Sequence, residues 1–166
     1  QDQRQEIQVR EIYDSGDGVA ILLINKRTEK ILLIRQFRLP VLLNGHPDGF
    51  IIECCAGLLD NAKPEDRALQ EIEEETGYRL DTIQKIYEGF ATPGAHMEKI
   101  HYYFGYYDET MKTGLGGGLK IEQEDIEIIE VPFPEINSLI ENGKIIDNKT
   151  IILLQWALLN KNQIFT

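Results

Sequence analysis

Basic residues are scarce in this sequence. Its 17 lysines and arginines stand against 28 aspartates and glutamates, which gives a formal net charge of −11 at pH 7. Proteins that bind nucleic acid do so largely through cationic contacts to phosphates, so this charge balance argues against a nucleic-acid partner. A small anionic ligand would be repelled by the same charge. Such a ligand would therefore need a metal cation as an intermediary.

Long apolar runs and cysteines are also few. No stretch reaches the roughly 18 apolar residues that span a bilayer, and no amino-terminal targeting segment is visible, so we expect a cytoplasmic protein without a membrane partner.

The two cysteines, Cys54 and Cys55, are adjacent. On a strand their side chains would point to opposite faces, which makes a disulfide or a shared metal unfavourable. We predict that both are small buried side chains.

The order of apolar stretches predicts a single α/β domain over residues 1–166. An apolar content of 42% is enough for a core, and no linker long enough to divide the chain is present. Short β-rich stretches between turn residues predict a mostly antiparallel sheet. The expected strands are residues 7–13, 19–24, 30–36, 50–55, 82–87, 99–107 and 126–131. Helices are expected at residues 64–76, 135–141 and 149–159.

Three glutamates in the predicted helix 64–76 are the strongest chemical signal. Glu71, Glu74 and Glu75 stand at i, i+3 and i+4, within about a 100° arc of one helix face. Carboxylates this close repel one another unless a cation lies between them. Oxygen ligands of this kind suit Mg²⁺, with Mn²⁺ as the alternative. A solvated acidic surface explains the helix equally well, so the surrounding sequence has to decide.

The surrounding residues resemble the Nudix box, in which a glycine precedes a helix that carries paired glutamates and ends at a second glycine. Residues 56–60, Ala-Gly-Leu-Leu-Asp, match before the helix, and residues 71–77 match in register. Further similar pieces are residues 34–38, 52–61, 92–94, 116–127 and 143–153. The resemblance is closest to the nucleotide-sugar branch of the family, which hydrolyses ADP-ribose or GDP-mannose. It implies the Nudix fold, an α/β/α sandwich around a mixed sheet.

Besides an interval from Gly57 to the helix that is one residue short, and Tyr78 in the last aliphatic place, two charged positions depart from the family pattern. Lys63 replaces the glutamate of the box and Gln70 replaces its arginine, so a pair that commonly forms in the family is lost at both ends. Arg67 lies one turn before Glu71 on the same helix face and is a candidate for the missing positive charge. The alternative is that Arg67 is a solvated surface arginine. Neither departure removes a carboxylate from the predicted metal site.

The resemblance also implies a reaction and roles for individual residues. Divalent ions bridge the pyrophosphate of the ligand and a carboxylate activates water. The implied metal ligands are Glu71, Glu74, Glu75, Glu124 and the backbone carbonyl of Ala56. The implied catalytic residues are Glu122, as the base, and Glu75. The implied substrate-binding residues are Arg35, Arg38, Glu53 and Glu98, of which the arginines suit bidentate phosphate contacts.

Each of these roles has a plainer alternative. Glu122 and Glu124 would otherwise be solvated charges on a loop, although the glycines at residues 116–118 provide a hinge that favours a functional loop. Arg38 would otherwise be a surface charge at the end of a strand. His96, as a lone loop histidine, is interpreted as solvated and is left out of catalysis.

Two functions from different classes fit the whole pattern. The first is Mg²⁺-dependent hydrolysis of the pyrophosphate of a nucleoside diphosphate sugar to a nucleoside monophosphate and a sugar phosphate. The second is a nucleotide-sugar-binding regulatory Nudix domain without turnover, for which Lys63 and Gln70 leave room. Related enzymes are homodimers with exchanged amino-terminal strands. The resemblance therefore implies a homodimer in which residues 1–15 form a contact.

Overall fold

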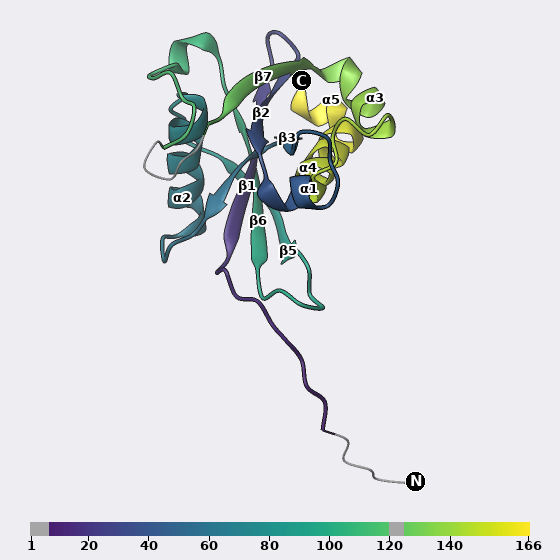
Figure 1. Cartoon of the computed structure of the whole chain (residues 1–166). Helices are drawn as coiled ribbons and strands as arrows, with labels where there is room; N and C mark the ends of the chain where they lie inside the picture. Colours follow the sequence, from purple (N-terminus) through teal and green to yellow (C-terminus); the bar gives the residue numbers. More distant parts are fainter. Residues whose placement is uncertain (1–6, 120–124) are drawn as a thin grey trace.

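A mixed sheet of seven strands forms the centre of the computed structural model, which describes residues 7–119 and 125–166 (Figure 1). The strands are β1 (Gly18–Asn25), β2 (Lys30–Phe37), β3 (Phe50–Glu53), β4 (Cys55–Leu58), β5 (Gln84–Phe90), β6 (Lys99–Tyr106) and β7 (Glu127–Pro132). Their main order is β3-β2-β1-β6-β5, while β4 pairs with β1 and β7 pairs with β2. The pair β1 and β6 is parallel, and the other pairs are antiparallel.

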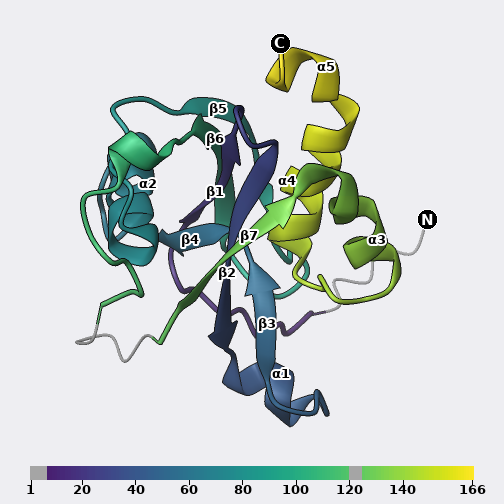
Figure 2. The ribbon, with the colours of Figure 1, turned by 90° about the horizontal axis from the view of Figure 1, so that it is seen from above.

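Helices cover both faces of this sheet (Figure 1, Figure 2). On one face lies α2 (Pro64–Glu71), which continues as a π-helical turn, η1 (Ile72–Thr76). On the other face lie α3 (Ile136–Glu141), α4 (Asn148–Leu159) and α5 (Lys161–Ile164). Shorter elements are α1 (Leu39–Leu43), η2 (Glu109–Met111) and η4 (Phe133–Glu135). The predicted α/β/α sandwich is confirmed.

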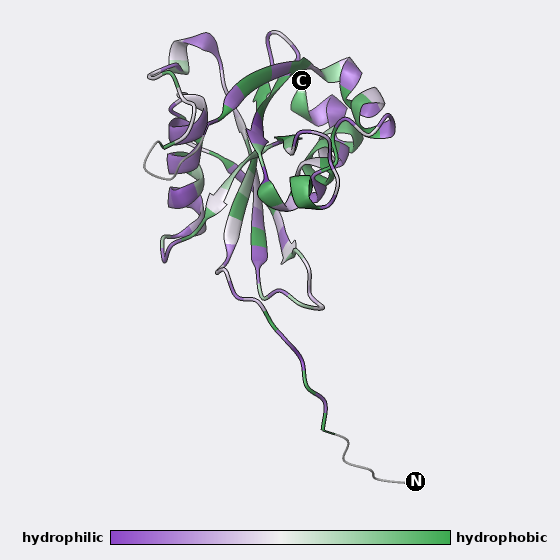
Figure 3. Ribbon diagram, in the orientation of Figure 1, coloured by the Kyte–Doolittle hydropathy of each residue, from purple (hydrophilic) through white to green (hydrophobic). Residues whose placement is uncertain are grey.

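Strand β1 is buried along its whole length because it lies between the two helical layers. Ala20, Leu22 and Ile24 pack into the core beneath α4, and the alternate residues pack into the core beneath α2. A strand covered on both faces is apolar at every position, which explains the unbroken apolar run of its sequence. The hydropathy of the helices agrees with this layering, since α2 is mostly hydrophilic on its outer side and α4 is largely hydrophobic (Figure 3).

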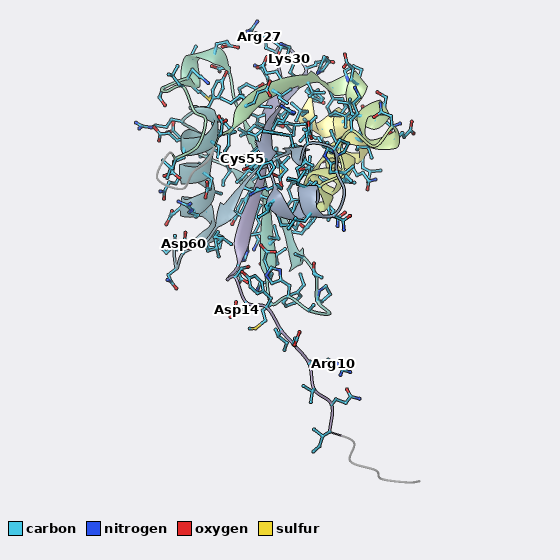
Figure 4. All side chains as sticks on the ribbon, viewed as in Figure 1. Arg10, Asp14, Arg27, Lys30, Cys55 and Asp60 are labelled. Atoms are coloured by element: carbon cyan, nitrogen blue, oxygen red, sulfur yellow. The ribbon has the colours of Figure 1, made fainter. Side chains whose placement is uncertain are left out.

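Cys54 and Cys55 confirm the prediction that they are buried packing residues. They are free thiols, one in each of the two cores, and Cys55 lies inside the body of the protein (Figure 4). Burial raises the pKa of Cys54 to about 12. Burial, reinforced by the nearby charge of Glu75, raises the pKa of Cys55 well above its usual range. Both thiols therefore stay protonated at neutral pH.

The predicted strand 50–55 is interrupted at Cys54. The backbone N–H of Cys54 donates to Thr150 Oγ1 of α4 at 2.7 Å instead of to a neighbouring strand. The hydroxyl of Thr150 in turn donates to Asp147, whose side chain caps the amino terminus of α4. A hydrogen bond to a helix about 100 residues away along the chain cannot be predicted from the local periodicity of the sequence. The predicted strand is therefore divided into β3 and β4.

Residues 7–13 do not form the predicted strand. This segment extends from the body of the protein as an arm that carries Arg10 (Figure 1, Figure 4). Ile7 and Val9 are 93% and 82% exposed. Among the arm's residues, Tyr13 makes an isolated bridge to His96. An extended segment becomes a strand by pairing along its length, so an apolar alternation alone overpredicts strand here.

No helix among the described residues is long and apolar enough to cross a membrane.

The helix that carries the acidic residues ends at Gly77, as predicted. Gly77 has a φ of +72°, in the left-handed region that side chains disfavour. Its carbonyl accepts from the N–H groups of Thr113 and Gly114 at 2.8 Å and 3.0 Å. A Cβ atom at position 77 would overlap the carbonyl of Gly114. Glycine is therefore required for the backbone conformation and for the close approach of the two segments.

We predict that Gly77→Ala destabilises the protein by about 2 to 5 kcal/mol, the sum of left-handed strain and a steric overlap. Gly143→Ala is the matched control, because Gly143 also has a φ of +72° but has open space around an added Cβ. The control is expected to cost about 1 to 2 kcal/mol from strain alone. Urea unfolding of both variants measures the difference, and equal losses would contradict the steric argument.

Candidate functional site

The buried glutamates of the acidic helix face strand β4. Glu71 and Glu75 are 5% and 1% exposed, which is unusual for carboxylates. The Oε2 atom of Glu75 accepts from the backbone N–H of Ala56 at 3.1 Å. Gly57 leaves the room that Glu71 occupies, since a Cβ atom there would overlap the Glu71 carboxylate. Two predicted metal ligands thus meet the backbone of residues 56 and 57 at one place.

Arg67 lies between the carboxylates and is not a solvated surface arginine. Only 11% of its side chain is exposed. Its guanidinium pairs with Glu71, lies 3.5 Å from Glu74 Oε2, and donates from Nε to the carbonyl of Leu58 at 2.9 Å. A cation in this position offsets the mutual repulsion of the glutamates. Arg67 therefore supplies the positive charge that the sequence pattern lacks at Gln70.

Glu74 differs from the other two predicted helix ligands. Its Oε1 atom accepts from Gln70 Nε2 at 2.7 Å, and its Oε2 atom lies near Arg67. Both oxygens thus have protein partners on their own helix. Glu73 points away from the site and pairs with Arg79 at the surface, as expected for a solvated residue. The pairing with Arg79 lowers the pKa of Glu73.

A cavity of about 320 Å³ lies beside these carboxylates. Four of the residues predicted from sequence line it, namely Arg38, Ala56, Glu71 and Glu98. Arg67, Lys149 and Asp60 complete its charged lining. A second cavity, of about 500 Å³, shares Glu98 and Lys149 with the first and is lined by Phe90, Tyr102, Ile146 and Ile152. A charged cavity thus adjoins a more apolar one.

A chain of paired charges supports the wall of these cavities. Glu53 is 3% exposed and accepts from Arg38 Nε at 2.8 Å. Its other oxygen lies 3.6 Å from Lys149 Nζ, which also donates to Asp147 at 2.8 Å. Burial alone would lower the pKa of Lys149, but the charges of Asp147 and Glu53 outweigh it and raise this pKa. Lys149 is therefore a permanent cation at the edge of both cavities.

Lys149 was missed by reasoning from the sequence. Residues 143–153 resemble the corresponding segment of the Nudix family, but a lone lysine at the start of a predicted helix has many surface roles. The signal that identifies it is spatial, because Glu53 on β3 approaches the first turn of α4. Glu53 itself was predicted to contact substrate. Among the described contacts it holds Arg38 and Lys149.

Arg35, which was predicted to bind substrate, lines neither cavity. Arg35 lies at the other side of β2, where it pairs with Asp48 and Glu127 at 3.4 Å and 3.2 Å. Glu122 and Glu124 lie outside the described residues. The glycines before them are fastened to the acidic helix, since the N–H of Gly117 donates to the carbonyl of Glu75 at 2.8 Å. The hinge at residues 116–118 stays a prediction.

The donor set at residues 56–75 fits a hard divalent cation. The donors are carboxylate and backbone groups, and two of the carboxylates are almost fully buried. Burying carboxylates costs free energy unless positive charge compensates it, and Arg67 is one such charge. Within residues 7–119 and 125–166, no three acidic, histidine or cysteine side chains converge as a complete ligand set. The described residues thus supply part of a metal site.

Comparison with known proteins places this site in a family. A family model described as NUDIX domain matches residues 14–154. A GDP-mannose pyrophosphatase of Pectobacterium atrosepticum is 43% identical over 152 residues, which covers 92% of this chain and 78% of the relative. A GDP-mannose pyrophosphatase of Yersinia enterocolitica is 47% identical over 150 residues, which covers 90% and 78%. The carboxylate helix, its flanking glycines and these matches make the chain a member of the Nudix family of hydrolases.

Proposed function

We propose that this Nudix hydrolase cuts the pyrophosphate of a nucleoside diphosphate sugar, with GDP-mannose as the first candidate and ADP-ribose as the second. Water adds to one phosphorus, and the products are a nucleoside monophosphate and a sugar phosphate. The observation that carries the proposal is the convergence of Glu71, Arg38 and Lys149 around one cavity, with Glu75 hydrogen-bonded to the backbone N–H of Ala56 in its wall. The choice of GDP-mannose is supported by the names of relatives that are 43% and 47% identical.

Magnesium is the proposed cofactor, with manganese as the alternative. Glu71, Glu75 and the backbone carbonyl of Ala56 would hold it, with Glu124 as a further ligand. Glu74 is a further candidate ligand, and its two oxygens already contact Gln70 and Arg67. When bound, the cation supplies charge neutralisation and polarises a phosphate oxygen. Glu122 is proposed to take the proton from the attacking water.

Arg38 is proposed to bind a phosphate of the substrate. Glu53 holds its Nε, which fixes the plane of the guanidinium and leaves the terminal nitrogens for oxygen acceptors. Lys149 adds a second positive charge at the same cavity. Glu98 carries a negative charge, so it suits a hydroxyl or N–H donor of the sugar or base rather than a phosphate. Arg35 is not part of this proposal because Asp48 and Glu127 engage it elsewhere.

The regulatory alternative drew its support from the loss of the box glutamate and arginine. Arg67 now provides a cation to Glu71 and Glu74 from one turn earlier in the helix, so this departure no longer argues against turnover. The homodimer and the cytoplasmic location stay predictions. The exposed apolar side chains of the arm at residues 7–13 support the homodimer, because such side chains are normally covered by a partner.

Turnover of a substrate panel tests the proposed function. We expect hydrolysis of GDP-mannose or ADP-ribose in the presence of Mg²⁺, with a nucleoside monophosphate and a sugar phosphate as products separated by chromatography. Nucleoside triphosphates are expected to react more slowly, because the proposed cavity joins a charged part to a separate apolar part that a triphosphate does not fill. Faster hydrolysis of triphosphates than of any nucleotide sugar would overturn the substrate class.

Glu75→Gln is expected to lower kcat/KM by at least about 100-fold, the upper range for groups that merely orient a metal ligand. The amide keeps the size of the side chain but lacks the charge that a cation requires. The matched control is Glu73→Gln, two positions earlier on the same helical segment, where the side chain pairs with Arg79 at the surface. Circular dichroism checks the fold of both variants. Comparable activity of the two variants would remove Glu75 from the metal site.

Arg38→Ala is expected to weaken binding of a nucleotide sugar by about 1.5 to 3 kcal/mol, the range for hydrogen bonds to charged groups. Arg38→Lys should recover part of this loss, since it keeps the charge but lacks the planar arrangement of donors. Isothermal titration calorimetry measures both affinities. Unchanged affinity in Arg38→Ala would show that this side chain does not contact the ligand.

A further inference from the structure

A serine, a histidine and a glutamate from two distant segments lie in a row at the edge of the proposed substrate cavity. The Oγ atom of Ser15 lies 2.9 Å from Nε2 of His96, and Nδ1 of His96 lies 3.4 Å from Oε2 of Glu98. The side chains of His96 and Glu98 are 22% and 20% exposed, so both are largely enclosed. The lone histidine that appeared solvated from the sequence is therefore hydrogen-bonded at Nε2 and faces a carboxylate with Nδ1.

The two oxygens of Glu98 face different surroundings. Oε2 is turned toward His96. Oε1 lies on the side of Gly18, 3.5 Å from the place that a Cβ atom there would occupy, and the residue lines both cavities. A carboxylate with one oxygen engaged by a fixed donor loses rotational freedom, which lowers the entropic cost of presenting the other oxygen to a ligand.

Backbone contacts fix the histidine in place. The N–H of Tyr13 donates to the carbonyl of Ala95 at 2.9 Å, and the N–H of Met97 donates to the carbonyl of Tyr13 at 3.0 Å. The rings of Tyr13 and His96 have centroids 5.1 Å apart. The loop before β6 is thus tied to the base of the amino-terminal arm directly beside Ser15. This arrangement gives His96 a defined orientation without any contact of its own with the cavity.

We propose that His96 is a positioning residue that orients Glu98 toward the substrate, with Ser15 selecting the tautomer. When the hydroxyl of Ser15 donates to Nε2, the ring proton resides on Nδ1 and is donated to Glu98. The ligand groups that Glu98 then meets are hydroxyl or N–H donors, because a carboxylate accepts hydrogen bonds and repels phosphate. The inference rests on the proposed function, since the cavity beside Glu98 is assigned to the nucleotide sugar.

Steady-state kinetics with GDP-mannose test this role. His96→Ala is expected to raise KM about threefold to tenfold, the effect of one hydrogen bond, and to change kcat by less than twofold. Glu98→Gln is expected to raise KM as well. In a double-mutant cycle the combined variant should be no worse than Glu98→Gln alone, because His96 acts through Glu98. Independent, multiplicative effects of the two substitutions would overturn the proposal.

His96→Asn provides the conservative rescue, because an asparagine amide places an N–H donor near the position of Nδ1. This variant should keep KM within twofold of the wild type, whereas Ser15→Ala should raise KM by less than His96→Ala does. The matched control is His101→Ala, since His101 has its own carboxylate neighbour, Glu88 at 3.2 Å, and lines neither cavity. Circular dichroism confirms that each variant is folded. An equal rise of KM in the control would overturn the proposal.

Calorimetric titration of GDP-mannose into the same variants separates this inference from the proposed function. If the wild type binds GDP-mannose but does not hydrolyse it, the proposed activity fails, and the double-mutant cycle is then evaluated from the dissociation constants of the variants. Non-additive effects of the His96 and Glu98 substitutions on the dissociation constant support the positioning role. Additive effects contradict it. Failure of the wild type to bind overturns both.

Discussion

Burying ionised carboxylates inside a fold costs several kcal/mol per charge unless other groups compensate. This chain places Glu71 and Glu75 against β4 with almost no exposure, and the structure around them supplies that compensation. The guanidinium of Arg67 lies beside Glu71, and the backbone of Ala56 donates to Glu75. Carboxylate and backbone oxygens are the ligands that a hard divalent cation prefers, and this donor chemistry is the basis of the proposed cofactor.

The fold makes this arrangement through close backbone approaches. The Glu71 carboxylate occupies the space that a side chain at Gly57 would fill, so helix α2 can lie directly on β4. At the other end, Gly77 stops the helix, and the carbonyl of Glu75 accepts from Gly117. The acidic helix is thus fixed at both ends. Side chains held in this way need little reorganisation on binding a cation, which is a requirement for a precise metal site.

The layers of the fold could be predicted from the sequence, but the contacts between those layers could not. Periodicity located the central strands and the acidic helix because their burial repeats at two or about 3.6 residues. It wrongly joined residues 50–55 into one strand, since the break at Cys54 depends on Thr150, and it predicted a strand at residues 7–13 that has no partner along its length. The helices α1 and α5 are too short for periodicity to detect. Lys149 and Ser15 gain their roles from segments that are distant in the sequence.

Arg67 shows why departures from a motif have to be judged by geometry. Gln70 indicates the loss of the ion pair with position 63, yet a guanidinium three residues earlier reaches Glu71 and Glu74, because positions 67, 71 and 74 share one helix face. Gln70 itself donates to Glu74, so the neutral side chain keeps a hydrogen bond where an arginine would form an ion pair. The site therefore requires a donor fork at a certain place on the helix, and more than one sequence position can provide it.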